Sequence, residues 1–268
     1  MALYFIGLGL GNEKSISVEG LEAIRKAEKV FLETYTSISP ASISELEEFY
    51  GKEIIAADRN LVESEAEKII EAGKKGNACF LVSGDVFSAT THTDLYLRAR
   101  KEGVELNVLN NASIMNAVSI TGLQLYNFGK TTSIPFNDDD WLPETPYKTI
   151  KENKERGLHT LCLLDIKTAE PSKENLKKGM NKPEQPRYMT INEAIKILKK
   201  LEEKKKEKLI TDDLLIIGVA RLGKKDQKIK AGKLSEIEAT DFGQPMHSLI
   251  IPGEMHELEA EMLESWMN

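Results

Sequence analysis

The chain has only two cysteines among its 268 residues, and both lie inside apolar stretches, "ACFLV" and "TLCLLD". Domains that are held together by disulfides carry more cysteines than this. We therefore expect Cys79 and Cys162 to be buried free thiols in a reducing, cytoplasmic compartment. The four histidines show no ligand-like spacing with one another or with the cysteines, so we predict no metal site.

Long apolar runs and an excess of basic residues are also missing. No run approaches the ~18 apolar residues of a membrane span, and the N-terminus lacks the pattern of a signal peptide. Acidic residues outnumber basic ones by 43 to 36, which gives a net charge of -7. Nucleic acid usually meets a basic surface. We therefore expect a soluble, cytoplasmic protein that binds neither nucleic acid nor a membrane.

Sequence motifs of covalent catalysis are not found either. The chain has no G-x-S-x-G elbow, no phosphate-binding loop ending in G-K-[ST], and no obvious nucleophile with a neighbouring base. The catalytic residues are therefore left unassigned. The absence of these motifs favours a reaction whose rate depends on positioning and desolvation of the reactants.

What the sequence does contain is a regular alternation of strand-like and helix-like segments. In the first half, apolar runs such as "ALYFIG", "KVFLE" and "NACFLV" alternate with amphipathic segments such as "SEAEKIIEAGKKG". The run "NACFLV" shows no polar alternation, which is typical of a central parallel strand covered on both faces. The alternation predicts an α/β fold with a parallel sheet between two layers of helices.

A change of composition near Ile134 predicts two lobes. The stretch "IPFNDDDWLPETPY" carries three prolines and three aspartates, so we place the crossing there, between a lobe of residues 1–134 and a lobe of residues 135–268. A polar, proline-containing stretch predicts a surface insertion at 169–187. The clearest helix follows it, with Thr190 and Glu193 as a capping box. In the first lobe, Ser17 could cap a helix that runs to about Ala27.

A glycine-rich turn follows the first predicted strand, in "LYFIGLGLGNEKSIS". A dinucleotide-binding turn has the spacing G-x-G-x-x-G, whereas here the third glycine comes one residue early. From the loop alone, a tight turn that simply needs glycine and a ligand-binding turn are equally supported.

Polar residues follow two further predicted strands. Asp85 comes after "NACFLV", and Ser113 comes after "VELNVL". Open α/β sheets bind ligands at the carboxyl ends of their strands, so both residues are candidates for contact with a ligand. Each could instead cap a helix, and for Ser113 both roles are compatible.

Six segments, taken together, resemble the diphthine synthase family of tetrapyrrole-methylase-like methyltransferases. They are "YFIGLGLGNEKSISVEGLEAI", "SGDVFSATTHTDLYLRA", "NNASIMNAVSITGLQLYNFGKTTSIPF", "ERGLHTLCLLDIK", "GVARLG" and "FGQPMHSLIIPG". They stand in the order and spacing of that family, and the similarity covers nearly the whole chain.

The resemblance implies a fold, a cofactor and partners. The fold is the two-lobed α/β fold of class III methyltransferases, with S-adenosyl-L-methionine in the inter-lobe cleft and S-adenosyl-L-homocysteine as product. The implied substrate is the 3-amino-3-carboxypropyl-histidine of translation elongation factor 2, an intermediate of diphthamide biosynthesis, and the implied assembly is a homodimer. The stretch 169–187 resembles the insertion of the eukaryotic type, which favours the tetramethylating activity that gives diphthine methyl ester.

The resemblance also implies eight cofactor-binding residues, read from the matching motifs. In the first lobe they are Leu10, Asp85, Ser88, Ser113 and Ile114; in the second they are Leu164, Leu222 and His247. Many members of the superfamily have a proline after the aspartate. Val86 stands there instead, so the shape of this loop is less fixed by the sequence.

Three alternatives remain open at this point. The enzyme could be a trimethylating diphthine synthase, which leaves the carboxylate free. It could be another tetrapyrrole-methylase-like enzyme that acts on a corrin or on ribosomal RNA, although the acidic balance disfavours RNA. It could also be a binding module that keeps the fold without turnover, which the intact motifs disfavour.

Overall fold

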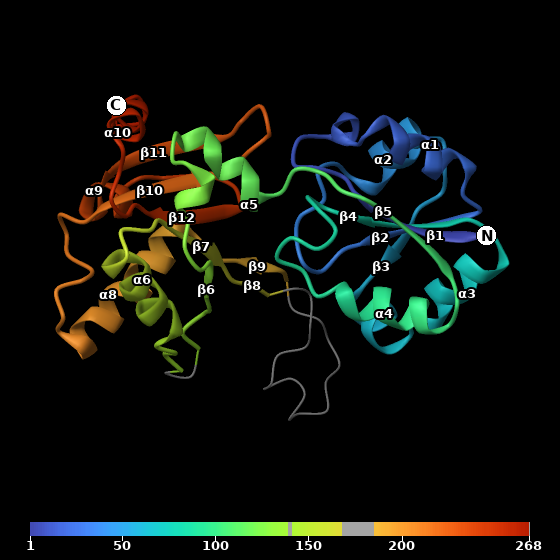
Figure 1. Ribbon diagram of the computed structural model, residues 1–268, viewed down its shortest axis with the longest axis horizontal. Helices are drawn as coiled ribbons and strands as arrows, with labels where there is room; N and C mark the ends of the chain where they lie inside the picture. The colour runs from blue at the N-terminus through green and yellow to red at the C-terminus, as the bar shows by residue number, and fades with distance from the viewer. Residues whose placement is uncertain (139–140, 168–184, 268) are drawn as a thin grey trace. The chain divides into compact units, whose positions relative to one another are not determined.

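The computed structural model describes residues 1–138, 141–167 and 185–267 (Figure 1). It divides into two compact units, each with its own sheet and core. The first unit is Met1–Ala117 with Gly223–Lys225, and the second is Val118–Leu222 with Asp226–Asn268. No helix of the described residues is long and apolar enough to cross a membrane.

The first unit contains a five-stranded sheet in the order β3-β2-β4-β1-β5, and every pairing in it is parallel. This confirms the parallel α/β arrangement predicted from the alternation of segments. The strands are β1 (Ala2–Gly7), β2 (Lys29–Glu33), β3 (Ile55–Ala57), β4 (Ala78–Val82) and β5 (Glu105–Leu109).

Helices cover both faces of this sheet (Figure 1). One core cluster joins α1 (Val18–Lys26) and α2 (Ile43–Tyr50) to alternate residues of β1 and β4. A second cluster joins α3 (Glu67–Lys75) and α4 (Thr93–Lys101) to the other residues of the same strands. The unit is completed by α5 (Ile114–Ala117), by the 3-10 turn η1 (Glu13–Ser15) and by the π-helical turn η2 (Asn60–Ser64).

The second unit has a mixed sheet in the order β11-β10-β12-β7-β6, in which only the β6–β7 pair is parallel. Its strands are β6 (Thr132–Ile134), β7 (Thr160–Leu164), β10 (Leu215–Ala220), β11 (Lys228–Lys233) and β12 (His247–Ile251). A short ribbon of β8 (Ile166–Lys167) and β9 (Arg187–Tyr188) continues from β7.

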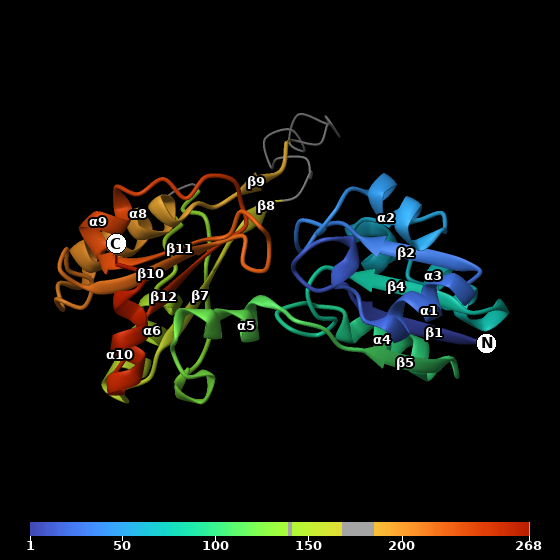
Figure 2. The same cartoon turned by 90° about the horizontal axis from the view of Figure 1, so that it is seen from above.

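The helices of the second unit are α6 (Thr145–Glu155), α8 (Ile191–Lys205), α9 (Leu234–Glu238) and α10 (Glu257–Glu264), with the 3-10 turns η3 (Val118–Thr121) and η4 (Leu125–Asn127). The first three pack on one core cluster with β6, β7, β10 and β12. The helix α10 lies beside η3 and η4, where Gln124 N donates to the Glu259 carboxylate at 2.7 Å. Figure 2 shows the same structure from above, with α10 and α6 labelled.

The boundary between the units falls earlier than the sequence predicts. The unit division lies between Ala117 and Val118, whereas we placed the crossing after Ile134. The reason is that β6, which ends at Ile134, pairs with β7 and so belongs to the second sheet. The proline-rich stretch is a connection inside the second unit that leads from β6 to α6. Most of the predicted insertion at 169–187 lies outside the described residues.

The predicted helix caps are confirmed. Ser17 accepts from Gly20 N at the start of α1, and Thr190 forms a reciprocal capping box with Glu193 at the start of α8. These side chains satisfy backbone amides that the helices leave unpaired. The two cysteines are free and buried, one in β4 and one in β7, and burial raises the pKa of each to about 12.

A buried pair, His159 and Glu259, joins α10 to the rest of the second unit. Gly253 N donates to His159 Nδ1 at 2.9 Å, so the proton lies on Nε2, which is 3.1 Å from Glu259 Oε1. Glu259 also accepts from the Gln124 and His256 amides. Burial acts to raise the pKa of Glu259, but these bonds outweigh it and lower the pKa.

We predict that Glu259→Ala lowers the free energy of unfolding by about 3 kcal/mol, because it leaves several buried donors without an acceptor. Urea denaturation at pH 7 measures this. Glu261→Ala, at an exposed position of the same helix, is the control and should change little. Because the pKa of Glu259 is lowered in the folded state, its contribution is complete above the unfolded pKa of about 4.3 and is lost as the pH falls through the folded pKa. Equal stability of the two variants at pH 7 would contradict this.

Candidate functional site

Five of the eight predicted site residues lie at the carboxyl edge of the parallel sheet in the first unit. Leu10 follows β1, Asp85 and Ser88 follow β4, and Ser113 and Ile114 follow β5. Because β4, β1 and β5 are neighbours in the sheet, the three loops are adjacent. The structure therefore brings these five residues together at one edge.

Two glycine turns fasten the first pair of loops. Gly9 N donates to Gly84 O at 3.0 Å, and Gly84 N donates to Gly9 O at 2.9 Å. Both glycines have left-handed backbone, with φ of 72° and 76°. A residue with a side chain is disfavoured there, so the glycines are needed for the conformation of the turns.

The carboxylate of Asp85 organises the loops around it. Its Oδ1 accepts from Phe87 N, Ser88 N and Ser88 Oγ, at 3.1, 3.2 and 2.9 Å. Its Oδ2 accepts from Asn110 Nδ2 at 2.9 Å and Asn111 N at 3.1 Å. Asp85 is 7% exposed. Burial acts to raise its pKa, but the bonds from Asn110, Asn111, Ser88 and Phe87 prevail and lower it. The carboxylate is thus ionised and saturated by donors of its own chain.

Asn111 is a second organising residue, which the sequence reasoning missed. Its Nδ2 donates to Gly7 O and to Ser15 O, both at 2.9 Å, while its backbone N–H reaches Asp85. One side chain thereby connects the ends of β1 and β5 with the turn η1. The signal was present as the pair Asn110–Asn111 directly after a strand, because short amide side chains bond readily to nearby backbone.

Serine hydroxyls and aliphatic side chains line the same edge. Ser113 is buried, its Oγ accepts from Met115 N at 3.2 Å, and its N–H donates to Asn116 Oδ1 at 2.8 Å. Leu10 and Ile114 are half-buried. The edge therefore presents polar and apolar side chains next to one another.

The other three predicted residues lie at one end of the second sheet. Leu164 is the last residue of β7, Leu222 follows β10 and His247 is the first residue of β12. In the register of the sheet, His247 is opposite Ala220, and Ser248 is opposite Leu163. The structure therefore places the ends of these three strands next to one another within the second unit.

Both ring nitrogens of His247 are hydrogen-bonded to backbone groups of the chain itself. Its Nε2 is 3.0 Å from Gln244 O, and Ile191 N donates to Nδ1 at 3.4 Å. The carbonyl can only accept, so Nε2 carries the proton and the ring is neutral. Burial is the main cause that lowers the pKa of His247. Any contact of His247 with a ligand is therefore made by its backbone or its ring carbons.

Arg221, which precedes Leu222, holds the loops after β10 and before β12. Its guanidinium donates to Phe242 O at 2.8 Å and to Gln244 O, and it pairs with Asp226 at 2.7 Å. The backbone of Arg221 is left-handed, with φ of 52°, and its N–H donates to Met246 O at 2.9 Å. These contacts fix the segment that carries Leu222 and His247.

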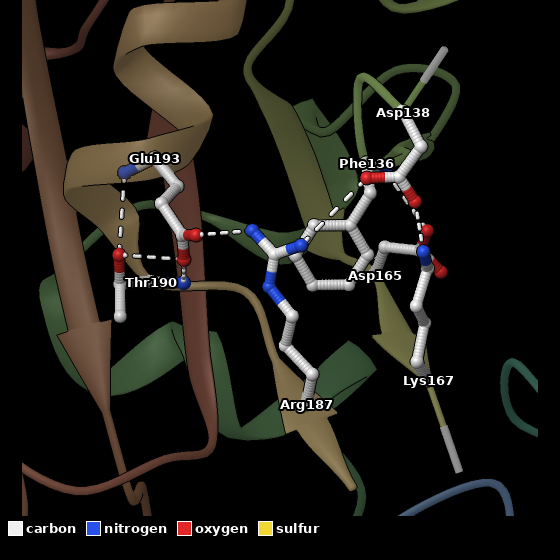
Figure 3. A network of polar contacts seen from close by, with 7 residues as sticks. All are labelled: Phe136, Asp138, Asp165, Lys167, Arg187, Thr190 and Glu193. Carbon is white, nitrogen blue, oxygen red and sulfur yellow. Dashed lines mark hydrogen bonds and ion pairs between the residues drawn. The ribbon is translucent and has the colours of Figure 1, made fainter. Parts of the chain in front are cut away.

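A polar network borders the same end of the second sheet (Figure 3). The Arg187 guanidinium lies 4.1 Å from the centroid of the Phe136 ring and donates to Glu193 at 2.7 Å. Asp138 pairs with Lys167 and lies 3.7 Å from Arg187. The network joins β8, β9 and the start of α8, directly after Leu164.

The ionisable groups of these two edges offer little acid–base chemistry. Asp85 is saturated with hydrogen bonds, and both ring nitrogens of His247 are engaged. Within the described ranges, no cluster of three or more His, Cys, Asp or Glu side chains could hold a metal ion. The arrangement is suited to binding and orienting a ligand.

Comparison with known proteins identifies the relatives of this chain. Residues 2–238 match the model of the tetrapyrrole (corrin/porphyrin) methylases. The diphthine methyl ester synthase of Bos taurus is 50% identical over 97% of this chain and 93% of its own length. That of Saccharomyces cerevisiae is 51% identical over 97% of this chain and 88% of its own length. A crystal structure of diphthine synthase is 34% identical, with a TM-score of 0.84, and the match covers 100% of this chain and 96% of that one.

We predict that Asp85→Ala lowers the free energy of unfolding by about 2 kcal/mol, because Asn110, Asn111 and Phe87 lose their shared acceptor. Ser88→Ala removes a single donor and should cost less than half as much. Urea titrations of both variants and of the unchanged chain measure this. If Asp85→Ala were no less stable than Ser88→Ala, the organising role of the carboxylate would be wrong.

Proposed function

This chain belongs to the tetrapyrrole methylase family and, within it, to the diphthine methyl ester synthases, and we propose that it methylates translation elongation factor 2. It is a methyltransferase with the two-unit α/β fold of that family. The substrate group we propose is the 3-amino-3-carboxypropyl-histidine of the factor, the intermediate of diphthamide biosynthesis that carries a free amine and a free carboxylate.

The observation that carries this proposal is the identity of about half of all residues to diphthine methyl ester synthases over nearly the whole chain. A likeness of the fold alone would leave the substrate open. The alternatives that act on corrins or ribosomal RNA, or that only bind, have no comparable support. The proposed product is diphthine methyl ester, after the name of these relatives.

The proposed methyl donor is S-adenosyl-L-methionine, whose sulfonium supplies an activated methyl group and an excellent leaving group. The chain's own residues then have to bind the donor, align it with the acceptor group and exclude water. Alignment alone is worth about 7–11 kcal/mol of a bimolecular barrier. The engaged side chains of Asp85 and His247 agree with this, because neither is placed to act as a base.

The eight cofactor-binding residues stay a proposal. The first unit would contribute Leu10, Asp85, Ser88, Ser113 and Ile114, and the second Leu164, Leu222 and His247. For Asp85, the saturated carboxylate means that the residue would shape the loop as well as contact the ligand. That one cofactor molecule contacts residues of both units is likewise a prediction.

The number of methyl groups separates the two closest alternatives. Methylation of the amine must be preceded by loss of a proton, because an amine is mostly protonated at neutral pH. Methylation of the carboxylate oxygen needs no such step. We propose that the enzyme does both and so transfers four methyl groups. A trimethylating enzyme would leave the carboxylate free.

We also propose that the enzyme is a cytoplasmic homodimer, acting without nucleic acid or membrane. An exposed apolar surface on the second unit supports self-association. It is formed by the side chains of Ile120, Leu125, Tyr126, Leu258 and Met262. Tyr126 is 79% exposed and Leu258 is 65% exposed, and such clustered exposure is typical of interfaces. The two segments meet where a Cβ at Gly122 would lie 2.3 Å from Met262 Cγ.

We predict that labelled methyl groups enter elongation factor 2 taken from cells that lack only this enzyme. Factor from cells that lack the first step of the pathway, which has a bare histidine, should not be labelled. A pocket that pairs the substrate carboxylate would be left with an unpaired donor, at a cost of about 1–3 kcal/mol.

Mass spectrometry of the labelled peptide counts the methyl groups, and mild alkali, which cleaves an ester, should remove one of four. Three alkali-stable methyl groups would identify the trimethylating alternative instead. Equal labelling of both factors would show that the proposed substrate is wrong.

We predict that Tyr126→Asp weakens dimerisation by about thirtyfold, because it places a charge at the most exposed of these five apolar side chains. Sedimentation equilibrium measures the dissociation constant. Leu97→Asp is the matched control, because Leu97 is an exposed apolar residue on α4 of the first unit. A dimer weakened by Leu97→Asp and not by Tyr126→Asp would place the interface elsewhere.

A further inference from the structure

The segment 83–92 joins β4 to α4, and one of its backbone carbonyls receives two side-chain donors. Thr90 Oγ1 donates to Val86 O at 2.6 Å. His92 Nδ1 lies 3.2 Å from the same oxygen. A carbonyl only accepts, so the His92 proton is on Nδ1. The two donors, four and six residues further on, fold the segment back onto Val86.

The packing of His92 does not explain why an imidazole stands at this position, because burying its unpaired Nε2 is unfavourable. The side chain is buried to 1% exposure, and its Nε2 has no hydrogen-bond partner in the described chain. Its ring packs edge-on against Phe80 and Tyr35, which a phenylalanine would also do without burying an unpaired acceptor. What a phenylalanine would not supply is the donor to Val86.

The loop between these contacts is strained. Ala89 has left-handed backbone, with φ of 61°, which is unfavourable for a residue with a Cβ. Such a conformation persists only where surrounding contacts determine it. Here the Ser88–Asp85 bonds hold it on one side and the Thr90–Val86 bond holds it on the other.

A proline could restrict the backbone at Val86 in place of the two side-chain donors. Among the described residues, no hydrogen bond is donated by the Val86 amide. Asp85 accepts from the amides of Phe87 and Ser88, so Val86 occupies the second position of a turn, where proline is favoured. A proline would therefore remove no hydrogen bond and would restrict φ by its ring.

We propose that Thr90 and His92 are positioning residues that clamp the Val86 carbonyl and so hold Asp85 and Ser88 in the conformation that the cofactor requires. The clamp itself is a property of the loop. Its effect on cofactor affinity rests on the proposed function.

The test compares Thr90→Val, His92→Phe and the double variant with the unchanged protein. Two quantities are measured: hydrogen exchange of the Phe87 and Ser88 amides, and the affinity for S-adenosyl-L-homocysteine by calorimetry. We expect each single change to weaken binding about three- to tenfold and the double change about thirtyfold, with faster exchange at both amides. His92→Asn, which keeps a donor close to the position of Nδ1, should bind nearly as the unchanged protein does.

The decisive variant adds Val86→Pro to the double change. If the clamp acts by restricting the loop, the proline should restore affinity to within about threefold and slow the exchange of the two amides. A side chain that mattered only for packing would not be replaced by a proline six residues away. Failure of the proline to restore either quantity in a folded protein would overturn the clamp.

Thr93→Val is the matched control, because Thr93 is exposed at the start of α4 and makes no side-chain hydrogen bond among the described residues. It should change neither quantity. If the unchanged protein binds no S-adenosyl-L-homocysteine, the proposed function is wrong, and the exchange measurement still decides the clamp. If the other variants do not fold, Thr90→Val, the mildest change, is used alone. Unaltered hydrogen exchange at the Phe87 and Ser88 amides in this variant would contradict the clamp.

Discussion

One carboxylate determines the shape of the edge on which the candidate site of the first unit is built. Asp85 receives donors from its own loop and from the loop after β5, so the ends of β4 and β5 cannot move independently. Asn111 extends the same network to the end of β1 and to η1. A buried charge is tolerated only where donors surround it, and here the donors are the loops themselves.

This internal demand has a consequence for the chemistry. The Asp85 carboxylate accepts hydrogen bonds at both oxygens, so it is not placed to take a proton from a substrate. The same holds for the neutral ring of His247, because each of its two nitrogens already has a hydrogen-bond partner. The side chains of Asp85 and His247 therefore serve to hold the loops at the two sheet edges in place. For a methyl transfer, rigid alignment of donor and acceptor is itself a source of rate acceleration.

The sequence was sufficient for the architecture of the first unit, because apolar runs without alternation and capped amphipathic helices are local signals. It was also sufficient for Ser17 and Thr190 as caps. It misplaced the boundary between the units, since the pairing of β6 with β7 is a long-range event that proline content does not report. The grouping of Asp85 and Ser113 followed from strand ends at one edge, whereas Leu10 came from the family resemblance. The contacts of Asn111, Thr90 and His92 did not, because they depend on where loops cross.

The two buried cysteines give the molecule a pair of internal reporters. Cys79 lies in β4, the central strand of the first sheet, and Cys162 lies in β7 of the second. Burial raises the pKa of both thiols, so neither is in its reactive thiolate form while its strand stays covered. Each thiol becomes available to an alkylating reagent only when its own sheet opens. The rates at which the two are modified therefore record the opening of each unit separately, in the natural sequence and without an attached label.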